Sequence, residues 1–149
     1  MADTYSQLYV HIIFSVKGRE PLIKDSIKNE LYAYIGGIIK NKGQKPIAIN
    51  GTADHIHILV GFKPDKSISE LVREIKSNSS KYVNENKFLP VKFHWQEGFG
   101  AFTYSHSQIT TVANYIARQD EHHKRKDFTT EYEDFLKKFN VKYDDKYIL

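Results

Sequence analysis

The sequence of 149 residues contains no cysteine. Disulfide bonds, thiol nucleophiles and cysteine-based zinc sites are therefore excluded, and this absence is typical of a cytoplasmic protein. Any metal ion that the chain binds must be held by histidine, carboxylate, amide or water ligands.

Long hydrophobic runs are also missing. No window of about 18 uninterrupted apolar residues occurs, and the opening residues from Met1 to Tyr5 lack the basic and then apolar pattern of a signal peptide. There is no repeat, low-complexity segment or linker. With 40% hydrophobic and 27% charged residues, the composition predicts one domain over residues 1–149 and no membrane segment.

Positive charge is in modest excess and is unevenly distributed. The formal net charge is +4; residues 1–119 hold 15 Lys and Arg against 10 Asp and Glu, whereas residues 120–149 hold 7 against 8. A basic main domain suits a partner that carries phosphate, such as a nucleic acid. A solvated basic surface accounts for the same numbers, so the charge leaves both interpretations open.

Strand-like alternation of apolar residues occurs in three segments, two of which are close enough to form a hairpin through residues 50–54. These strands are predicted at residues 7–16, 46–50 and 55–62. Residues 91–104 are aromatic and punctuated by glycine, which predicts a bent strand or two short ones.

Helical spacing of apolar residues predicts four helices between and after these strands. One of them has Ser67 as its N-cap with Glu70 three residues on, as in a capping box. The predicted helices run from about residue 27 to 40, from Ser67 to Val83, from Ser105 or Ser107 past Ile116, and from 129 to 139.

The order of elements is strand, helix, strand, strand, helix, strand, followed by helices. This βαββαβ order predicts an α+β fold of the ferredoxin-like, or RRM-like, kind, in which helices pack on an antiparallel sheet. The core is expected over residues 5–126, with a C-terminal helical extension over 127–149. RNA-binding modules, small-molecule enzymes and nucleases share this fold, so it does not determine function.

Two histidines open the strand predicted at residues 55–62. Side chains two residues apart on a strand point to the same face, so His55 and His57 lie side by side while Ile56 and Ile58 face the opposite way. Adjacent imidazoles form a chelating pair for a divalent metal. Two surface or hydrogen-bonded histidines would give the same pattern, so the pair is a hypothesis for a metal site.

A tyrosine and a glutamine form the second candidate pair. Tyr115 and Gln119 lie four residues apart in the predicted third helix, so they are neighbours on its surface. Both lie on one edge of the apolar stripe that contains Val112 and Ile116, where side chains can reach an adjoining surface. Ordinary boundary residues would occupy the same positions.

The histidine–hydrophobic–histidine motif, followed about 60 residues later by Tyr-x-x-x-Gln, resembles a known family. It is similar to the single-tyrosine HUH transposases of small insertion sequences, the IS200-like family, which includes the transposases associated with repetitive extragenic palindromes. The resemblance extends from about Tyr5 to about Lys126. Further segments that match are YVHIIFSVKGREPLI at 9–23, SELVREIKSNSSK at 69–81 and WQEGFGAF at 95–102.

The resemblance implies a specific chemistry. The family cleaves single-stranded DNA with a tyrosine hydroxyl, which leaves a 5′-phosphotyrosine and a free 3′-OH. It implies Tyr115 as the nucleophile and His55, His57 and Gln119 as ligands of Mg²⁺ or Mn²⁺. Ligand chemistry alone would also allow zinc or nickel. A phenol with a pKa of about 10 is protonated at neutral pH, so a cation or base nearby is needed.

The resemblance also implies partners. Single-stranded DNA with hairpins at the ends of a mobile element is the expected substrate, and a homodimer with active sites completed in trans is the expected assembly. His122 and His123 are candidates for further DNA or metal contacts, but a solvated pair in a charged stretch is the favoured interpretation. The aromatic residues of 91–104 are interpreted as core or dimer contacts rather than base-stacking groups. The predicted phosphate contacts are Arg73, Lys76, Lys81 and Arg118, although exposed basic residues are often only solvated.

Two classes of function remain. The first is an enzyme that cleaves and joins single strands of DNA. The alternative is a non-catalytic single-stranded nucleic-acid or hairpin-binding module of the same fold. RRM-type sheets carry aromatic residues where this chain has His55 and His57, which argues against an RNA binder of that type. The short chain and Gln119 disfavour a replication initiator or relaxase.

Overall fold

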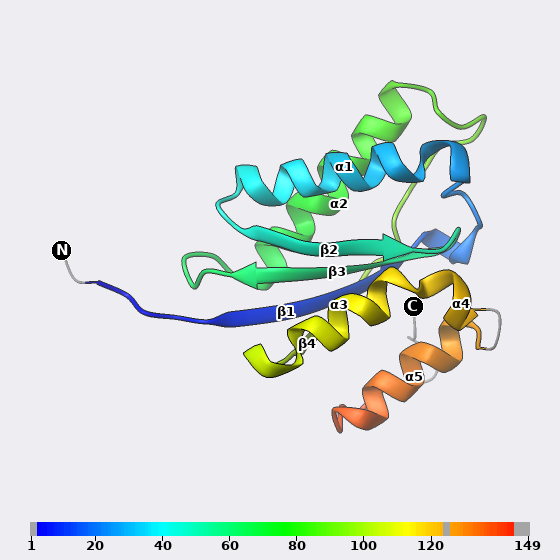
Figure 1. The fold of residues 1–149 in the computed structure, drawn as a ribbon. Coiled ribbons are helices and arrows are strands. Elements are labelled where there is room, and N and C mark those ends of the chain that lie inside the picture. The colour runs from blue at the N-terminus through cyan, green and yellow to red at the C-terminus, as the bar shows by residue number, and fades with distance from the viewer. Residues whose placement is uncertain (1–2, 124–125, 145–149) are drawn as a thin grey trace.

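The computed structural model describes residues 3–123 and 126–144 and is built on a four-stranded sheet (Figure 1). All strand pairs are antiparallel, and the order across the sheet is β2-β3-β1-β4. This arrangement confirms the predicted ferredoxin-like α+β fold. The strands are β1 (Leu8–Ser15), β2 (Lys45–Gly51), β3 (His55–Phe62) and β4 (Gly100–Thr103).

Helices cover both faces of the sheet (Figure 1). α1 (Asp25–Asn41) and α2 (Ile68–Glu85) lie on one face. The predicted N-cap of α2 is confirmed, since the Ser67 hydroxyl accepts the Glu70 backbone N–H at 3.0 Å. None of the helices in residues 3–123 and 126–144 has the length and apolar content needed to cross a membrane. The opposite face carries α3 (Ile109–Ala117), α4 (Gln119–His123) and α5 (Phe128–Lys138).

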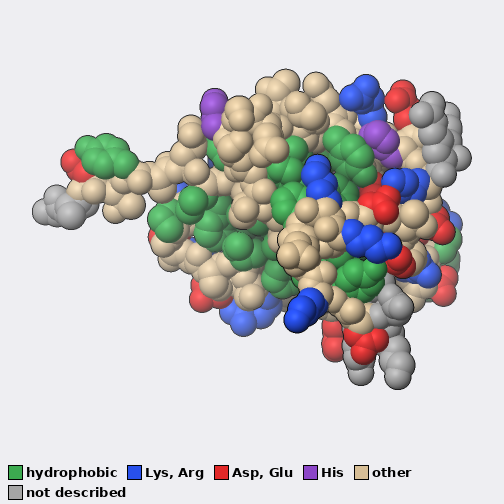
Figure 2. Space-filling model, turned by 90° about the horizontal axis from the view of Figure 1, so that it is seen from below, with side chains coloured by type: hydrophobic (Ala, Val, Ile, Leu, Met, Phe, Trp, Pro, Cys, Tyr) green, Lys and Arg blue, Asp and Glu red, His purple; other side chains and the backbone are tan. Residues whose placement is uncertain are grey.

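Both faces of β3 are interior. Ile56 and Ile58 are 0% exposed on the side of α1 and α2, and His55 and His57 are also 0% exposed on the other side. The histidine face of β3 is therefore not a free surface, because α3, α4 and α5 cover it. Figure 2 views the molecule from this covered side, where Lys and Arg side chains stand among hydrophobic and acidic ones.

The predicted third helix is interrupted between its two candidate residues. α3 ends at Ala117 and α4 begins at Gln119, with Arg118 at φ −107° and ψ 30° between them. The last carbonyls of α3 accept hydrogen bonds from the Asn50 amide at 2.9 and 3.2 Å, which satisfies groups that a continuing helix would use. The single helix predicted through Tyr115 and Gln119 is thus two helices, and the break directs Gln119 into the interior.

The aromatic segment before α3 packs in the core, as expected. It contains one short strand, β4, and an isolated bridge between Trp95 and Val16. The Trp95 indole donates a hydrogen bond to the Ser79 hydroxyl at 2.9 Å and packs edge-on against Phe14, with ring centroids 4.8 Å apart. Phe93 and Trp95 are buried, so these rings are not available to stack bases.

Gly51 ends β2 in close contact with β3. A Cβ atom added there would lie 2.1 Å from the His55 carbonyl oxygen and 2.9 Å from the Ile56 Cα. Because backbone atoms cannot move aside, we expect Gly51→Ala to lower the free energy of unfolding by about 2 kcal/mol or more, measured by urea denaturation.

The matched control is Gly37→Ala in α1, where an added Cβ meets no atom within 4 Å. Alanine is favoured over glycine inside a helix by about 0.5–1 kcal/mol, so this variant should be slightly more stable than the wild type. Equal stability of Gly51→Ala and the wild type would contradict the close approach.

Candidate active site

His55 stands at the start of β3, and its two ring nitrogens have different partners. Nδ1 lies 2.7 Å from Asp54 Oδ1 and 3.0 Å from Thr52 Oγ1. Burial works against the charged form, yet the hydrogen bonds to Asp54 and Glu131 raise the pKa of His55 above its ordinary value. A carboxylate on Nδ1 fixes the ring and leaves Nε2 directed inward, which is the usual setting of a metal-binding histidine.

His57 lies between His11 and Glu131. Its Nδ1 is 2.8 Å from His11 Nε2, and its Nε2 is 3.0 Å from Glu131 Oε1. His11 Nδ1 in turn lies 3.3 Å from the Tyr104 hydroxyl. Burial lowers the pKa of His57 to about 4 and that of His11 well below its ordinary value, so both rings are neutral. Each neutral ring offers one donor and one acceptor, and a carboxylate only accepts. His57 therefore donates to Glu131 and accepts from His11, which in turn accepts from the Tyr104 hydroxyl.

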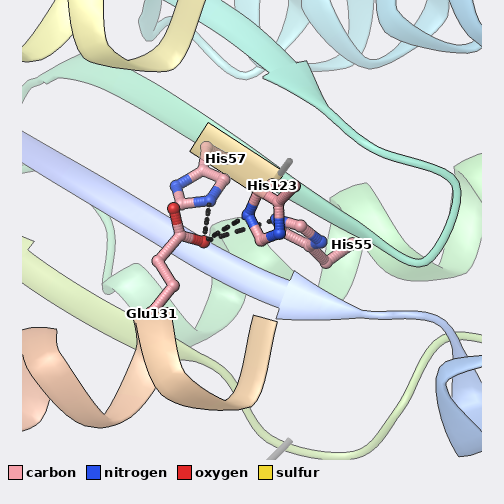
Figure 3. A group of neighbouring side chains, drawn as sticks. All are labelled: His55, His57, His123 and Glu131. Carbon is pink, nitrogen blue, oxygen red and sulfur yellow. Dashed lines mark hydrogen bonds and ion pairs between the residues drawn. The ribbon is translucent and has the colours of Figure 1, made fainter. Parts of the chain in front are cut away.

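Glu131 of α5 lies at the centre of the cluster (Figure 3). Its Oε1 is 3.0 Å from Nε2 of both His57 and His123, and 3.5 Å from Nε2 of His55. Burial opposes ionisation, but the hydrogen bonds from these three histidines bring the pKa of Glu131 well below its usual range. One buried, ionised carboxylate therefore connects the strand histidines to the C-terminal helices.

The second oxygen of Glu131 faces the two predicted helix residues. Oε2 accepts a hydrogen bond from the Tyr115 hydroxyl and lies 3.3 Å from the Gln119 amide nitrogen. Gln119 Oε1 is 3.2 Å from His55 Nε2, and the Tyr115 and His57 rings are 6.0 Å apart. Burial, together with Glu131, raises the pKa of Tyr115. The structure thus brings all four residues predicted from the motifs into one cluster.

Two members of the cluster were not among the predicted site residues. His123 is bonded to Glu131 and its side chain is only 13% exposed, so its interpretation as a solvated residue is wrong. Glu131 lies in the part of the chain predicted only as a helical extension, of which residues 145–149 are outside the described residues. One feature of the sequence does single out Glu131: it lies three residues after Phe128 and four before Phe135, so it is a charged residue within an apolar helical stripe.

The donor atoms fit a divalent metal. Those of His55, His57, His123 and Glu131 lie within 4.8 Å of one another. Ligands bound at about 2.1 Å to one small ion lie about 3 to 3.4 Å apart, which is close to the 3.0 and 3.5 Å separations around Glu131 Oε1. Imidazole suits transition metals and carboxylate suits Mn²⁺ and Mg²⁺, and Gln119 adds a neutral oxygen beside His55.

A cavity of ≈ 280 Å³ adjoins the cluster between α3 and α5. Tyr115 and Glu131 form part of its lining, so the cavity reaches the pair that joins the tyrosine to the histidines. Tyr104 and Phe135 add aromatic surface, and the basic residues Lys126 and Lys138 also line it. The cavity is therefore the open space next to the candidate nucleophile.

The predicted phosphate contacts are divided between two sides of the sheet. Arg73, Lys76 and Lys81 belong to α2, on the face opposite the histidines. The Lys76 ammonium donates to two backbone carbonyls before β4, at 2.7 and 2.6 Å, and burial lowers its pKa to about 8. Arg118, exposed at the break between α3 and α4, is on the same side as Tyr115.

The fold and the site together define a class of protein. In this class, a central strand of a ferredoxin-like sheet carries a histidine pair, and the helices that cover this strand supply a tyrosine and a glutamine. A family model described as "Transposase IS200 like" matches residues 4–119. The chain therefore belongs to the IS200-like transposase family, as its resemblance implied. The matched range contains His55, His57, Tyr115 and Gln119, whereas His123 and Glu131 lie beyond it.

Individual relatives agree with this assignment. Over 120 residues the chain is 23% identical to the ISDra2 transposase TnpA of Deinococcus radiodurans, and this match covers 77% of this chain and 86% of the relative. A candidate transposase from Deinococcus radiodurans R1 has a similar fold, with a TM-score of 0.65, 21% identity, and coverage of 80% of this chain and 95% of that one. A REP-associated tyrosine transposase bound to a REP hairpin gives a TM-score of 0.62 at 16% identity, covering 83% and 73%.

Proposed function

We propose that this protein is a metal-dependent transposase that cleaves and rejoins single-stranded DNA through a 5′-phosphotyrosine intermediate. The observation that carries the proposal is the Tyr115 hydroxyl, which is hydrogen-bonded to the same carboxylate that contacts His57. Membership of the IS200-like transposase family supports DNA as the substrate.

In the proposed cleavage, the Tyr115 oxygen forms a bond to the phosphorus of a phosphodiester, and the bond between phosphorus and the 3′ oxygen breaks. The phenol loses its proton, the 5′ end of the DNA stays on the tyrosine as an ester, and the 3′ oxygen takes up a proton. The ester retains the energy of the original bond, so attack by a 3′-OH reverses the step and joins two strands without ATP.

We propose that His55, His57 and Gln119 hold a divalent metal, with His123 and Glu131 as further donors within reach. When bound, such an ion polarises the scissile phosphate and stabilises the charge that gathers on it. Mg²⁺ and Mn²⁺ are the proposed ions. The imidazole-rich set favours Mn²⁺ of the two, because Mg²⁺ prefers oxygen ligands.

The proposed substrate is single-stranded DNA that carries a hairpin. The basic bias of residues 1–119 and a structural relative that is bound to a REP hairpin support this choice. Arg118 is proposed to contact phosphates near the scissile bond. Arg73, Lys76 and Lys81 would contact DNA only away from the site, because α2 lies on the other face of the sheet.

The experiment that tests the function uses a labelled single-stranded oligonucleotide with a hairpin taken from the DNA that flanks the gene. The protein is incubated with it and with Mg²⁺ or Mn²⁺, and a covalent protein–DNA band is sought on a denaturing gel. Tight hairpin binding without an adduct under either metal would instead support a non-catalytic hairpin-binding module.

A homodimer is part of the proposal, and a mixing experiment tests how its sites are completed. Within one chain the Tyr115 and His57 rings lie 6.0 Å apart, so we expect a mixture of Tyr115→Phe and His57→Ala chains to form no adduct. Recovery of about a quarter of the wild-type adduct would show that sites are completed in trans, since half of the dimers would be mixed and each mixed dimer would hold one intact site of two. Light scattering gives the oligomeric state.

A further inference from the structure

Glu131 lies beyond the residues that the family model matches, yet it is built into the site. It is 3% exposed, and two aromatic residues of the same helix keep α5 against the reacting groups. The Phe128 ring stacks on His55 with centroids 4.2 Å apart, and the Phe135 ring packs edge-on against Tyr115 at 5.8 Å. The position of the Glu131 carboxylate is therefore set by packing on both sides of it.

The two carboxylate oxygens have separate partners. Oε1 is 3.0 Å from Nε2 of both His57 and His123, whereas Oε2 accepts the hydrogen bond from the Tyr115 hydroxyl. A half-buried tyrosine hydroxyl needs a hydrogen-bond partner. The Glu131 carboxylate is that partner, and it holds the hydroxyl beside the imidazoles. The His122 ring stacks on the Tyr115 ring, with the two centroids 4.3 Å apart.

We propose that Glu131 is the positioning residue of the nucleophile. Held by His123 through one oxygen and by the packing of α5, it fixes the Tyr115 hydroxyl beside the histidine pair through the other. The inference rests on the proposed function, because it assigns a role in the same cleavage step. Orientation of a nucleophile affects the rate of the bond-forming step and not the affinity for DNA, so the role can be separated from binding.

The test measures single-turnover adduct formation at saturating Mn²⁺ over a range of DNA concentrations. For Glu131→Gln we expect the maximal rate to fall about tenfold, because the amide oxygen still accepts from the tyrosine but the NH₂ group cannot accept from His123. For Glu131→Ala we expect a fall of about a hundredfold, since no acceptor remains. The DNA concentration at half-maximal rate should stay at the wild-type value in both.

Glu133→Gln is the matched control, because residues two apart on a helix do not face the same side, and it should retain the wild-type rate. Thermal melting followed by circular dichroism checks folding; where Glu131→Ala fails to fold, the nearly isosteric Gln variant decides. A wild-type rate in Glu131→Gln would overturn the inference. Full recovery of the rate at Mn²⁺ concentrations above those that saturate the wild type would also overturn it, because Glu131 would then be only a metal ligand. A rise in the half-saturating DNA concentration at an unchanged maximal rate would overturn it as well. A wild-type protein without any adduct would refute the proposed function itself.

Discussion

Replacement of Tyr115 by phenylalanine is expected to reduce covalent adduct formation by at least about a thousandfold, because the substitution removes the oxygen that would attack phosphorus. The ring contacts with His122 and Phe135 do not depend on the hydroxyl. Glu131 keeps its contacts with the histidines, so the free energy of unfolding should change by only about 1 kcal/mol. Loss of the adduct would therefore reflect chemistry and not unfolding.

Tyr104→Phe provides the matched control for this variant. Tyr104 lines the same cavity and its hydroxyl contacts His11, so the substitution also removes one phenolic oxygen near the site. It should retain adduct formation on a denaturing gel with labelled DNA, and both variants should bind the hairpin oligonucleotide as the wild type does. An adduct in Tyr115→Phe at the wild-type rate would exclude Tyr115 as the nucleophile.

The second large effect is expected in metal binding by His57→Ala. Loss of an imidazole from the centre of the cluster should weaken Mn²⁺ binding by more than about a hundredfold, as measured by isothermal titration calorimetry. The same change removes one of the partners of Glu131 Oε1, at 3.0 Å, and the partner of His11 Nε2, at 2.8 Å. The free energy of unfolding should therefore fall by about 3 kcal/mol.

His106→Ala is the control for a histidine outside the cluster. His106 is exposed and its Nδ1 lies 3.0 Å from the Tyr9 hydroxyl, so its removal should alter neither Mn²⁺ affinity nor stability by a measurable amount. Retention of Mn²⁺ affinity in His57→Ala would place any metal site elsewhere on the chain. The metal-free melting temperature distinguishes a lost ligand from a lost fold, because the titration is interpretable only while the variant is folded.

Local pattern was sufficient to predict the elements and their order. Side-chain alternation is a geometric property of a strand, so His55 and His57 had to share one face of β3 wherever that strand lay. The helical spacing of apolar residues, with the cap at Ser67, likewise predicted α1, α2 and α5 to within a few residues of their bounds. The motif of two histidines, Tyr115 and Gln119 also carried the family resemblance that the match over residues 4–119 confirms.

Local pattern could not show which elements would cover the histidine face. An open sheet face and a covered one have the same alternation, so the burial of His55 and His57 depended on where α3, α4 and α5 pack. The break at Arg118 depended on Asn50, a residue far away in the sequence, whose amide bonds the last carbonyls of α3. Such contacts leave no periodic signal near the residue that they affect.

The sequence by itself therefore determined the fold class, the family and the four motif residues of the site, because these depend on the order and periodicity of residues along the chain. Only the tertiary structure decided that His123 and Glu131 join them and that Arg73, Lys76 and Lys81 lie on the opposite side of the sheet. The physical reason is that a buried charge such as Glu131 is stable only where several partners contact it. Most of those partners are distant in the sequence, and only the packing of the helices on the sheet brings them together.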